Sequence, residues 1–334
     1  MAESKKKSVV VIGGGTGTHA VLTGLKKYKK QLDLTAVVAM TDSGGSTGRL
    51  RDEFGYLPVG DVRMALVALA SDIDAHKELV RKLFLHRFDK GNGLSGHNFG
   101  NLLIVALTDI LGSEEEAINV AGEILQVEGR VIPVTTEKTH LVAKYEDGVV
   151  VKGEHDIDEP MKERNGNRIV DLYVEPVANI GKSAERAILG ADLIVLGPGD
   201  VYTSVLTNCV IGGVSEAIQR SEAKVIYISN LMTKAGQTSG MGVSEHILEI
   251  SKYIGKTPDH VIVNTASFED GLLDKYSLQE EYPVEVNCGE EGCNIVLGEF
   301  AAKQKVVTSK GDTLRRSLVR HDPSRLAGAI VDLL

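Results

Sequence analysis

The sequence contains no tryptophan, and aromatic residues make up only 4% of the chain. Proteins that bind single-stranded nucleic acid stack the bases on aromatic side chains, so this class is disfavoured. Basic residues are also scarce for such a role, because 37 lysines and arginines face 46 acidic residues and the net charge is −9. Binding to a phosphate backbone requires a basic surface. The composition therefore indicates a protein without a nucleic-acid partner.

Cysteines and long apolar segments are scarce as well. The three cysteines, Cys209, Cys288 and Cys293, are too few and too scattered for a disulfide framework, which favours a reducing compartment. No segment approaches the roughly 18 apolar residues that a membrane helix requires. The basic segment 1–7 leads into an apolar stretch that is too short for a signal-peptide core. We therefore expect a cytoplasmic protein with no membrane span.

Glycine is abundant, and its most informative cluster follows an apolar stretch at residues 8–12 and precedes an amphipathic helix. Backbone amides in such a turn can approach an anion closely, and the positive end of the helix dipole favours the anion. Residues 15–20 fit the G-x-G-x-x-A form of the dinucleotide fingerprint. The alternative is a tight turn that needs glycine for close packing. The candidate phosphate contacts are Gly13, Gly14, Gly15, Thr16 and Gly17.

Apolar runs rich in valine and isoleucine alternate with helical patterns along the chain. We predict buried strands at residues 9–12, 34–40, 191–196, 225–229 and 260–264. We predict helices at residues 19–30, 61–70, 77–88, 98–111, 114–125, 204–220, 243–254 and 325–334. This alternation is typical of an α/β protein with a Rossmann-like, doubly wound, mainly parallel sheet.

The middle of the chain differs from the rest. Short strand patterns at 130–134, 141–145 and 149–152 precede a charged segment, 156–167, that is broken by proline and glycine. We interpret residues 1–334 as one domain in which 130–175 form a small β-rich insertion, with 156–167 as a surface loop.

Four predicted strands end in polar loops that contain glycine, at residues 13–18, 41–49, 197–204 and 230–236. Ligands of open α/β sheets bind beyond the carboxyl ends of the strands, so these loops predict one ligand cleft. Asp42 is suited to ribose hydroxyls or a cation, or alternatively to capping a turn. The other candidates from the second loop are Ser43, Gly44, Gly45 and Ser46, and those from the third and fourth loops are Gly197, Gly199, Tyr202, Thr203, Ser204, Asn230 and Thr233.

Two further groups precede predicted helices. Asp61 is equally suited to capping a helix or to binding a ligand, and Arg63 could contact a phosphate or a ribose. His97, Asn98 and Asn101 could contact a phosphate or a sugar, or could cap their own helix. No arrangement of serine, histidine and aspartate suggests a hydrolase triad, and the sequence assigns no catalytic residue.

Together these segments resemble the gluconeogenesis factor family, also called YvcK/CofD-like, over nearly the whole chain. The motifs that carry the resemblance are Ile12-Gly-Gly-Gly-Thr-Gly17, Asp42-Ser-Gly-Gly-Ser-Thr-Gly-Arg-Leu-Arg51, Pro58-Val-Gly-Asp-Val-Arg63, Gly91-Asn-Gly-Leu-Ser-Gly-His-Asn-Phe-Gly-Asn-Leu-Leu103, Gly197-Pro-Gly-Asp-Val-Tyr-Thr-Ser-Val205, Asn230-Leu-Met-Thr233 and Val319-Arg-His-Asp322.

The family has two branches with different functions. One branch comprises regulators of cell-wall growth and shape during gluconeogenesis that bind nucleotide sugars such as UDP-N-acetylglucosamine. The other is the 2-phospho-L-lactate transferase of coenzyme F420 biosynthesis, which uses Mg²⁺ and releases GMP. The segments 91–103 and 319–322 resemble the regulator branch, which implies a nucleotide-sugar ligand, a homodimer, a protein partner in cell-wall regulation and no certain cofactor. The transferase is the alternative, with Mg²⁺ at Asp42.

The chain departs from the family pattern after the second strand, where two adjacent aspartates are usual and Asp42 and Ser43 stand here. One carboxylate and one hydroxyl hold Mg²⁺ less well than two carboxylates do, which counts against the transferase. Tyr276 and Arg320 match family positions linked to nucleotide-sugar recognition. A plain dinucleotide-binding protein is a third hypothesis, although no acidic residue lies at the usual distance after Gly15.

Overall fold

The computed structural model describes residues 5–71, 75–159, 167–289, 292–303 and 317–334. Within these residues, seven strands form one parallel sheet in the order β10-β9-β8-β7-β1-β2-β3. The strands are β1 (Lys7–Ile12), β2 (Leu32–Val38), β3 (Arg130–Pro133), β7 (Leu193–Leu196), β8 (Lys224–Ile228), β9 (His260–Asn264) and β10 (Asn294–Gly298). The order runs outward in both directions from β1, as in Rossmann-type folds, and this confirms the predicted fold class.

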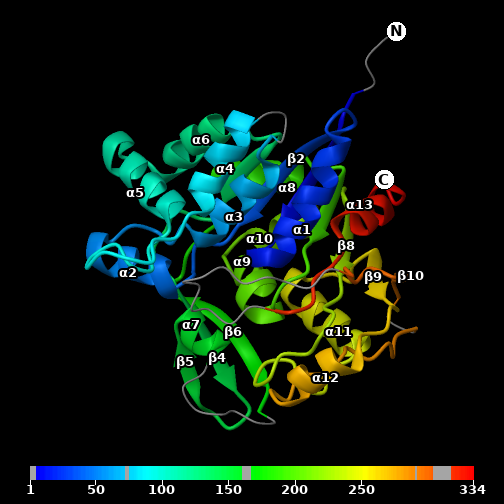
Figure 1. The fold of residues 1–334 in the computed structure, drawn as a ribbon. Coiled ribbons are helices and arrows are strands. Elements are labelled where there is room, and N and C mark those ends of the chain that lie inside the picture. The colour runs from blue at the N-terminus through cyan, green and yellow to red at the C-terminus, as the bar shows by residue number, and fades with distance from the viewer. Residues whose placement is uncertain (1–4, 72–74, 160–166, 290–291, 304–316) are drawn as a thin grey trace.

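The central strands are buried on both faces because valine and isoleucine alternate between two hydrophobic cores. Val9 and Val11 of β1 face one core, whereas Val10 and Ile12 face the other. The first core is covered by α1 (Gly15–Leu25), α3 (Gly60–Leu69), α4 (Ala75–Leu85), α5 (Phe99–Leu111), α6 (Glu114–Leu125) and α13 (Pro323–Val331). The second core is covered by α8 (Lys182–Leu189), α9 (Thr207–Cys209), α10 (Val214–Arg220) and α11 (Val243–Ile254). In Figure 1, α1 and α13 lie side by side close to the C-terminus.

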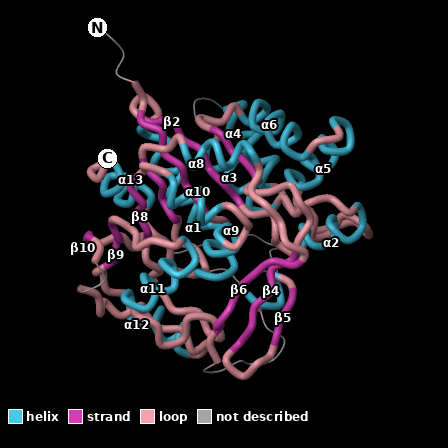
Figure 2. The backbone as a smooth tube through the Cα atoms, turned by 180° about the vertical axis from the view of Figure 1, so that it is seen from behind, coloured by secondary structure: helices cyan, strands magenta, loops and turns pink. Residues whose placement is uncertain are grey.

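A small antiparallel sheet in the order β5-β4-β6 is inserted between β3 and β7. Its strands are β4 (His140–Tyr145), β5 (Val150–Lys152) and β6 (Ile169–Glu175), and the short helix α7 (Glu154–Asp158) follows β5. Leu141, Ala143 and Leu172 point into the second core, so the insert packs against the main body. Figure 2 shows this sheet at the lower edge of the molecule, below the main sheet.

The structure differs from the sequence-based boundaries in the middle of the chain. Arg130–Pro133 pairs in parallel with β2 and forms the edge of the main sheet, so the insert begins after it rather than at residue 130. The segment predicted as a surface loop at 156–167 contains the end of α7. Residues 160–166 of that segment lie outside the described residues.

The predicted helix at 204–220 is wrong in its continuity. The chain forms a π-helix, η2 (Val201–Leu206), then α9, and begins α10 only at Val214. Gly213 has a φ of 90°, a left-handed conformation that interrupts a helix. Three further helices were not predicted, namely α2 (Gly45–Phe54), α8 and α12 (Asp270–Ser277). The strands β6 and β10 were not predicted either. The 3-10 helix η1 (Lys26–Tyr28) ends the segment that begins with α1.

The strand order reverses direction between β1 and β7, which are neighbours in the sheet and pair in parallel. The segments that follow them, 13–17 and 197–204, therefore emerge side by side at the carboxyl edge. No helix in the described part of the chain is both long enough and apolar enough to span a bilayer.

Two glycines in the α1–α13 pair provide a matched test of this packing. A Cβ at Gly24 would overlap the carbonyl oxygen of Pro323, whereas a Cβ at Gly328 would meet no atom within 4 Å. We expect Gly24→Ala to lower the free energy of unfolding by several kcal/mol, since overpacking costs about 1–3 kcal/mol or more. Gly328→Ala should instead raise it by about 0.5–1 kcal/mol because alanine favours helix. Urea unfolding measures both, and equal effects would contradict the packing described here.

Candidate functional site

A cleft of about 350 Å³ opens at the carboxyl edge of the sheet, at the reversal of strand order. Its walls come from the segments after β1, β2, β7 and β8, from α7 of the insert, from α12 and from residues 317–321. Ligand pockets commonly have volumes of about 300–1,000 Å³. The cleft is therefore large enough for a small ligand, and it lies where the sequence places one.

The structure separates the predicted site residues into two groups. Those that line the cleft are Gly14, Gly15, Thr16, Gly17, Asp42, Gly44, Gly199, Thr203, Ser204, Asn230, Thr233, Tyr276 and Arg320. Those that do not line it are Gly13, Ser43, Gly45, Ser46, Arg63, His97, Asn98, Asn101, Gly197 and Tyr202.

The first glycine segment lines the cleft and also packs closely against the segment after β7. The N–H of Gly15 donates a 2.9 Å hydrogen bond to Asp61 Oδ1, so Asp61 caps α1 rather than its own helix. A Cβ at Gly17 would overlap the carbonyl oxygen of Pro198, so this glycine permits the segments after β1 and β7 to touch. The packing interpretation therefore holds at Gly17, while the positive end of α1 still faces the cleft.

The segment after β2 is fastened to the insert. Asp42 Oδ1 accepts the N–H of Gly44 at 2.8 Å, which forms an Asx turn. Ser43 Oγ accepts the N–H of His155 at 3.0 Å, so this side chain contacts α7. Asp42 consequently lies in the cleft wall with a fixed orientation.

A buried polar network behind the cleft contains the residues that were expected to contact a ligand near α5. Ser46 Oγ lies 3.2 Å from His97 Nδ1 and accepts the N–H of Asn98 at 3.2 Å. The Asn98 side chain accepts the N–H of Asn101 and so caps α5. Arg63 Nε donates to Asn101 Oδ1 at 2.7 Å. These contacts tie α2, α3 and α5 together behind the cleft.

The segment after β7 contributes only part of what was expected. Tyr202 is buried, its hydroxyl donates to the carbonyl of Ile169 at 3.4 Å, and burial raises its pKa. Tyr202 thus lies in the second hydrophobic core and not among the residues that line the cleft. Thr203 and Ser204 do line the cleft. The side chain of Asn230, after β8, donates to the carbonyl of Gly199 at 2.7 Å and thereby joins two walls.

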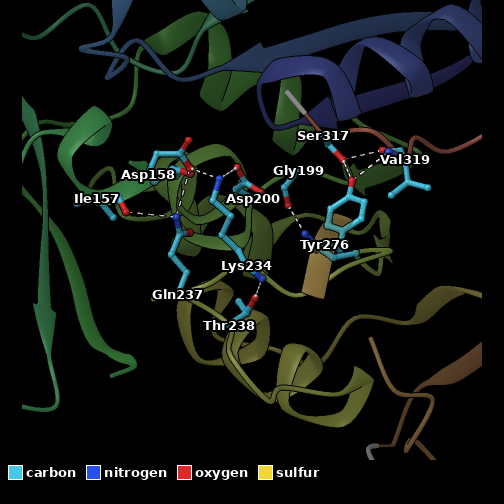
Figure 3. Close-up of polar contacts among 12 residues, drawn as sticks. Ile157, Asp158, Gly199, Asp200, Lys234, Gln237, Thr238, Tyr276, Ser317 and Val319 are labelled. Carbon is cyan, nitrogen blue, oxygen red and sulfur yellow. Dashed lines mark hydrogen bonds and ion pairs between the residues drawn. The ribbon is translucent and has the colours of Figure 1, made fainter. Parts of the chain in front are cut away.

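Tyr276 holds the last wall in place. Its ring is only 5% exposed, and its hydroxyl accepts the N–H groups of Leu318 at 2.8 Å and Val319 at 3.1 Å. It also lies 3.0 Å from Ser317 Oγ, as Figure 3 shows. The tyrosine therefore orders the segment that carries Arg320, and its ring is packed in a small apolar cluster with Leu231 and Val319.

Sequence reasoning missed seven charged residues of the cleft, which are Glu154, Asp158, Glu159, Asp200, Lys234, Lys275 and Glu281. Lys234 Nζ lies 3.3 Å from Asp158 Oδ1 and 3.5 Å from Asp200 Oδ2, between the insert and the main sheet (Figure 3). Asp200 and Lys234 lie in the loops 197–204 and 230–236, which the sequence already indicated as parts of the cleft. Their positions in these loops were therefore enough to make them candidates. Glu154 and Asp158 carried no such signal, because only tertiary packing brings α7 to the cleft.

Burial raises the pKa of the Asp200 carboxyl to about 6, with Lys234 opposing the shift and Asp158 adding to it. Burial likewise raises the pKa of Glu154 well above its usual range, and the charges of Asp42, Asp158 and Asp61 add to this. Burial acts on Asp158 in the same direction, but Lys234 and hydrogen bonds from its neighbours hold its pKa below the usual value. The cleft therefore contains two carboxyl groups, those of Asp200 and Glu154, whose pKa values are raised above the usual range.

The donor set does not favour a metal ion held by the protein. Among the described residues, no three His, Cys, Asp or Glu side chains are grouped so that they could bind one metal ion. One oxygen of Asp42 and one of Asp61 are engaged by backbone N–H groups.

The strand order and the helices on both faces of the sheet place this chain among proteins with a Rossmann-type fold. The family model described as 2-phospho-L-lactate transferase CofD matches residues 9–301, and the chain belongs to this CofD family. It is 37% identical to the gluconeogenesis factor of Bacillus subtilis, covering 99% of both chains. A Thermotoga maritima relative is 41% identical over 96% of this chain and 98% of its own length.

Solved structures agree with this assignment. A crystal structure of a Bacillus halodurans protein matches 98% of this chain and 100% of its own, with a TM-score of 0.87 and 37% identity. The predicted family is therefore confirmed, and the whole chain takes part in the similarity.

The role of Tyr276 can be tested by removing one oxygen atom. We expect Tyr276→Phe to increase amide exchange at residues 318–319 and to lower stability by about 1–3 kcal/mol, the cost of leaving buried donors without an acceptor. Hydrogen–deuterium exchange with mass spectrometry measures the first effect. Tyr282→Phe, at a side chain that is 53% exposed, is the control. Unchanged exchange in Tyr276→Phe would contradict the positioning role.

The raised pKa of Asp200 predicts a pH-dependent stability difference. The folded protein holds this proton more tightly than the unfolded chain, so stability falls as the pH rises from about 4 to about 6, and the loss is complete above that range. We expect Asp200→Asn to be more stable than wild type above pH 7, and the difference to shrink as the pH falls toward 4. Urea unfolding across this range checks the sign. A variant that is less stable at neutral pH would contradict it.

Proposed function

We propose that this protein is a cytoplasmic regulator that binds a nucleotide sugar, of the UDP-N-acetylglucosamine type, without turning it over. The observation that carries the proposal is the meeting of two glycine-containing segments and two helix N-termini at the reversal of strand order. In Rossmann-type folds this is where nucleotide phosphates bind. The diphosphate would lie across the segment 14–17, and the sugar would lie near 199–204.

The charges and hydroxyl groups of the cleft support such a ligand. Lys234, Lys275 and Arg320 line it and can offer charge-assisted hydrogen bonds to phosphate oxygens. Thr16, Thr203 and Ser204 add hydroxyl groups suited to a sugar or a phosphate. Full-length similarity to gluconeogenesis factors supports a role during gluconeogenic growth, and we propose that this role is the maintenance of cell wall and shape. With this role we propose a homodimer that signals to a protein partner by ordering its cleft segments when the ligand binds.

The alternative is a Mg²⁺-dependent phospholactate transferase, which the description of the matching family model favours. Ser43 after Asp42, and the engagement of Asp42 and Asp61 by backbone amides, count against it. Release of GMP from a guanylylated phospholactate donor would establish the transferase. Calorimetric titration with UDP-N-acetylglucosamine, UDP-glucose, NAD and GTP with Mg²⁺ separates the hypotheses, because each predicts a different ligand.

Two variants test the position of the ligand. We expect Arg320→Met and Lys275→Met each to weaken UDP-N-acetylglucosamine binding by about tenfold, since a charge-assisted hydrogen bond contributes about 1.5–3 kcal/mol. Lys256→Met is the matched control. Lys256 pairs with Asp259, which precedes β9 at the opposite edge of the sheet. Calorimetric affinities that fall equally in all three variants, or in none, would refute this binding mode.

A further inference from the structure

Lys234 links the insert to the main sheet across the cleft. Its ammonium group pairs with Asp158 of α7 and with Asp200 of the segment after β7, and all three residues line the cleft. The exposed fractions of their side chains are 17% for Lys234, 22% for Asp158 and 38% for Asp200. The link is therefore accessible to a ligand in the cleft (Figure 3).

The backbone of Lys234 is held independently of its side chain. Its N–H donates to Thr238 Oγ1 at 2.8 Å, and its carbonyl accepts the N–H of Thr238 at 2.9 Å. The long, flexible lysine side chain can consequently change partners while the segment after β8 stays in place.

Asp158 is also anchored by neutral donors. Thr203 Oγ1 donates to its Oδ1 at 3.2 Å, and Gln237 Nε2 donates to the same oxygen at 3.3 Å and to the carbonyl of Ile157 at 3.4 Å. These contacts keep α7 against the main sheet without the lysine. The ion pair is therefore one of several contacts between α7 and the main body.

The charges around Lys234 favour its contact with an anionic ligand. The carboxylates that line the described cleft come from every wall and are Asp42, Asp61, Glu154, Asp158, Glu159, Asp200 and Glu281, whereas its lysines and arginines are Lys234, Lys275 and Arg320. His155 and His321 also line it, and burial lowers the pKa of His321 to about 4, so His321 is neutral at pH 7. An arriving diphosphate meets more negative than positive side chains, and it gains most from a cation that can turn toward it.

We propose that Lys234 is a positioning residue that passes from the Asp158–Asp200 pair to the phosphate of the ligand, and that the two aspartates then take up a proton from solution. This inference rests on the proposed nucleotide-sugar function. Lys234 is then the residue that adapts an acidic cleft to an anionic ligand. Because binding is coupled to proton uptake, the ligand binds more tightly as the pH falls.

The proton uptake follows from the loss of the cation. Lys234 opposes the upward pKa shift of Asp200 and lowers the pKa of Asp158. When the ammonium group moves away and phosphate charge arrives, both changes favour protonation of the pair. Two interacting carboxylates then share the proton, so the uptake belongs to the pair rather than to one residue.

The experiment is calorimetric titration of the full chain with UDP-N-acetylglucosamine in buffers of different ionisation enthalpy. Its diphosphate is esterified at both ends and does not itself titrate near neutral pH, so any proton exchange comes from the protein. At about pH 7 we expect wild type to take up a few tenths of a proton to about one proton per ligand.

Two variants remove the exchange in different ways. Lys234→Met should lose most of the proton uptake and bind about tenfold more weakly, because the ligand loses a charge-assisted contact. Asp200→Asn should also lose the uptake but bind several-fold more tightly at about pH 7.5, since a negative charge is gone and Lys234 is less constrained. A merely structural role would weaken binding in both. Lys152→Met, which breaks the exposed Lys152–Glu175 pair of the insert, should behave as wild type.

The outcomes separate this inference from the function on which it rests. Absence of saturable UDP-N-acetylglucosamine binding by wild type overturns both. If wild type binds without proton exchange, the proposed movement of Lys234 is overturned but the proposed function stands. The same conclusion follows if Lys234→Met binds with undiminished proton exchange. Loss of exchange in Lys152→Met would likewise overturn it, because the effect would then not be specific to Lys234.

Discussion

The close approach of two backbone segments at the reversal of strand order is the constraint on which the site depends. Gly17 leaves no room for a side chain against Pro198, and Gly13 and Gly197 both lie against Thr18. This contact brings the N-terminus of α1 beside the π-helix that follows β7. A side chain at Gly17 would push the two segments apart. The cleft thus arises from backbone packing, and the ligand-facing groups occupy the space that this packing leaves.

The insert completes the cleft and gives it its charge. The inner face of β4 and β6 joins the second hydrophobic core, which fixes the position of α7. From α7, Glu154 and Asp158 enter an already acidic cleft, where Lys234 compensates part of their charge. Burying carboxylates near one another is unfavourable unless cations or protons balance them. The lysine of such a site can readily leave its carboxylate partners for an anionic ligand.

Sequence patterns gave most of the fold but only part of the site. The central strands were predictable because continuous valine and isoleucine runs occur only where both faces are buried, and α6 matches its predicted range of residues 114–125. The segments at 45–54 and 270–277 were missed as helices because they are polar and contain glycine. Arg63, His97, Asn98 and Asn101 looked like ligand contacts, since a polar residue near a glycine-bearing loop has the same composition whether it faces a ligand or a neighbouring helix.

The sequence by itself determined the alternation of strands and helices, the glycine segments at the strand ends and the family, because each depends on local composition and ordered motifs. Tertiary structure alone decided which polar residues meet. It made the hydroxyl of Tyr276 the acceptor that orders residues 318–319, a contact that no sequence pattern indicated. It directed the side chain of Asp61, a residue of α3, to the first N–H group of α1. It also brought Asp158 and Lys234 together as an ion pair. The physical reason is that charge pairing and burial depend on distances in space, whereas a sequence specifies only distances along the chain.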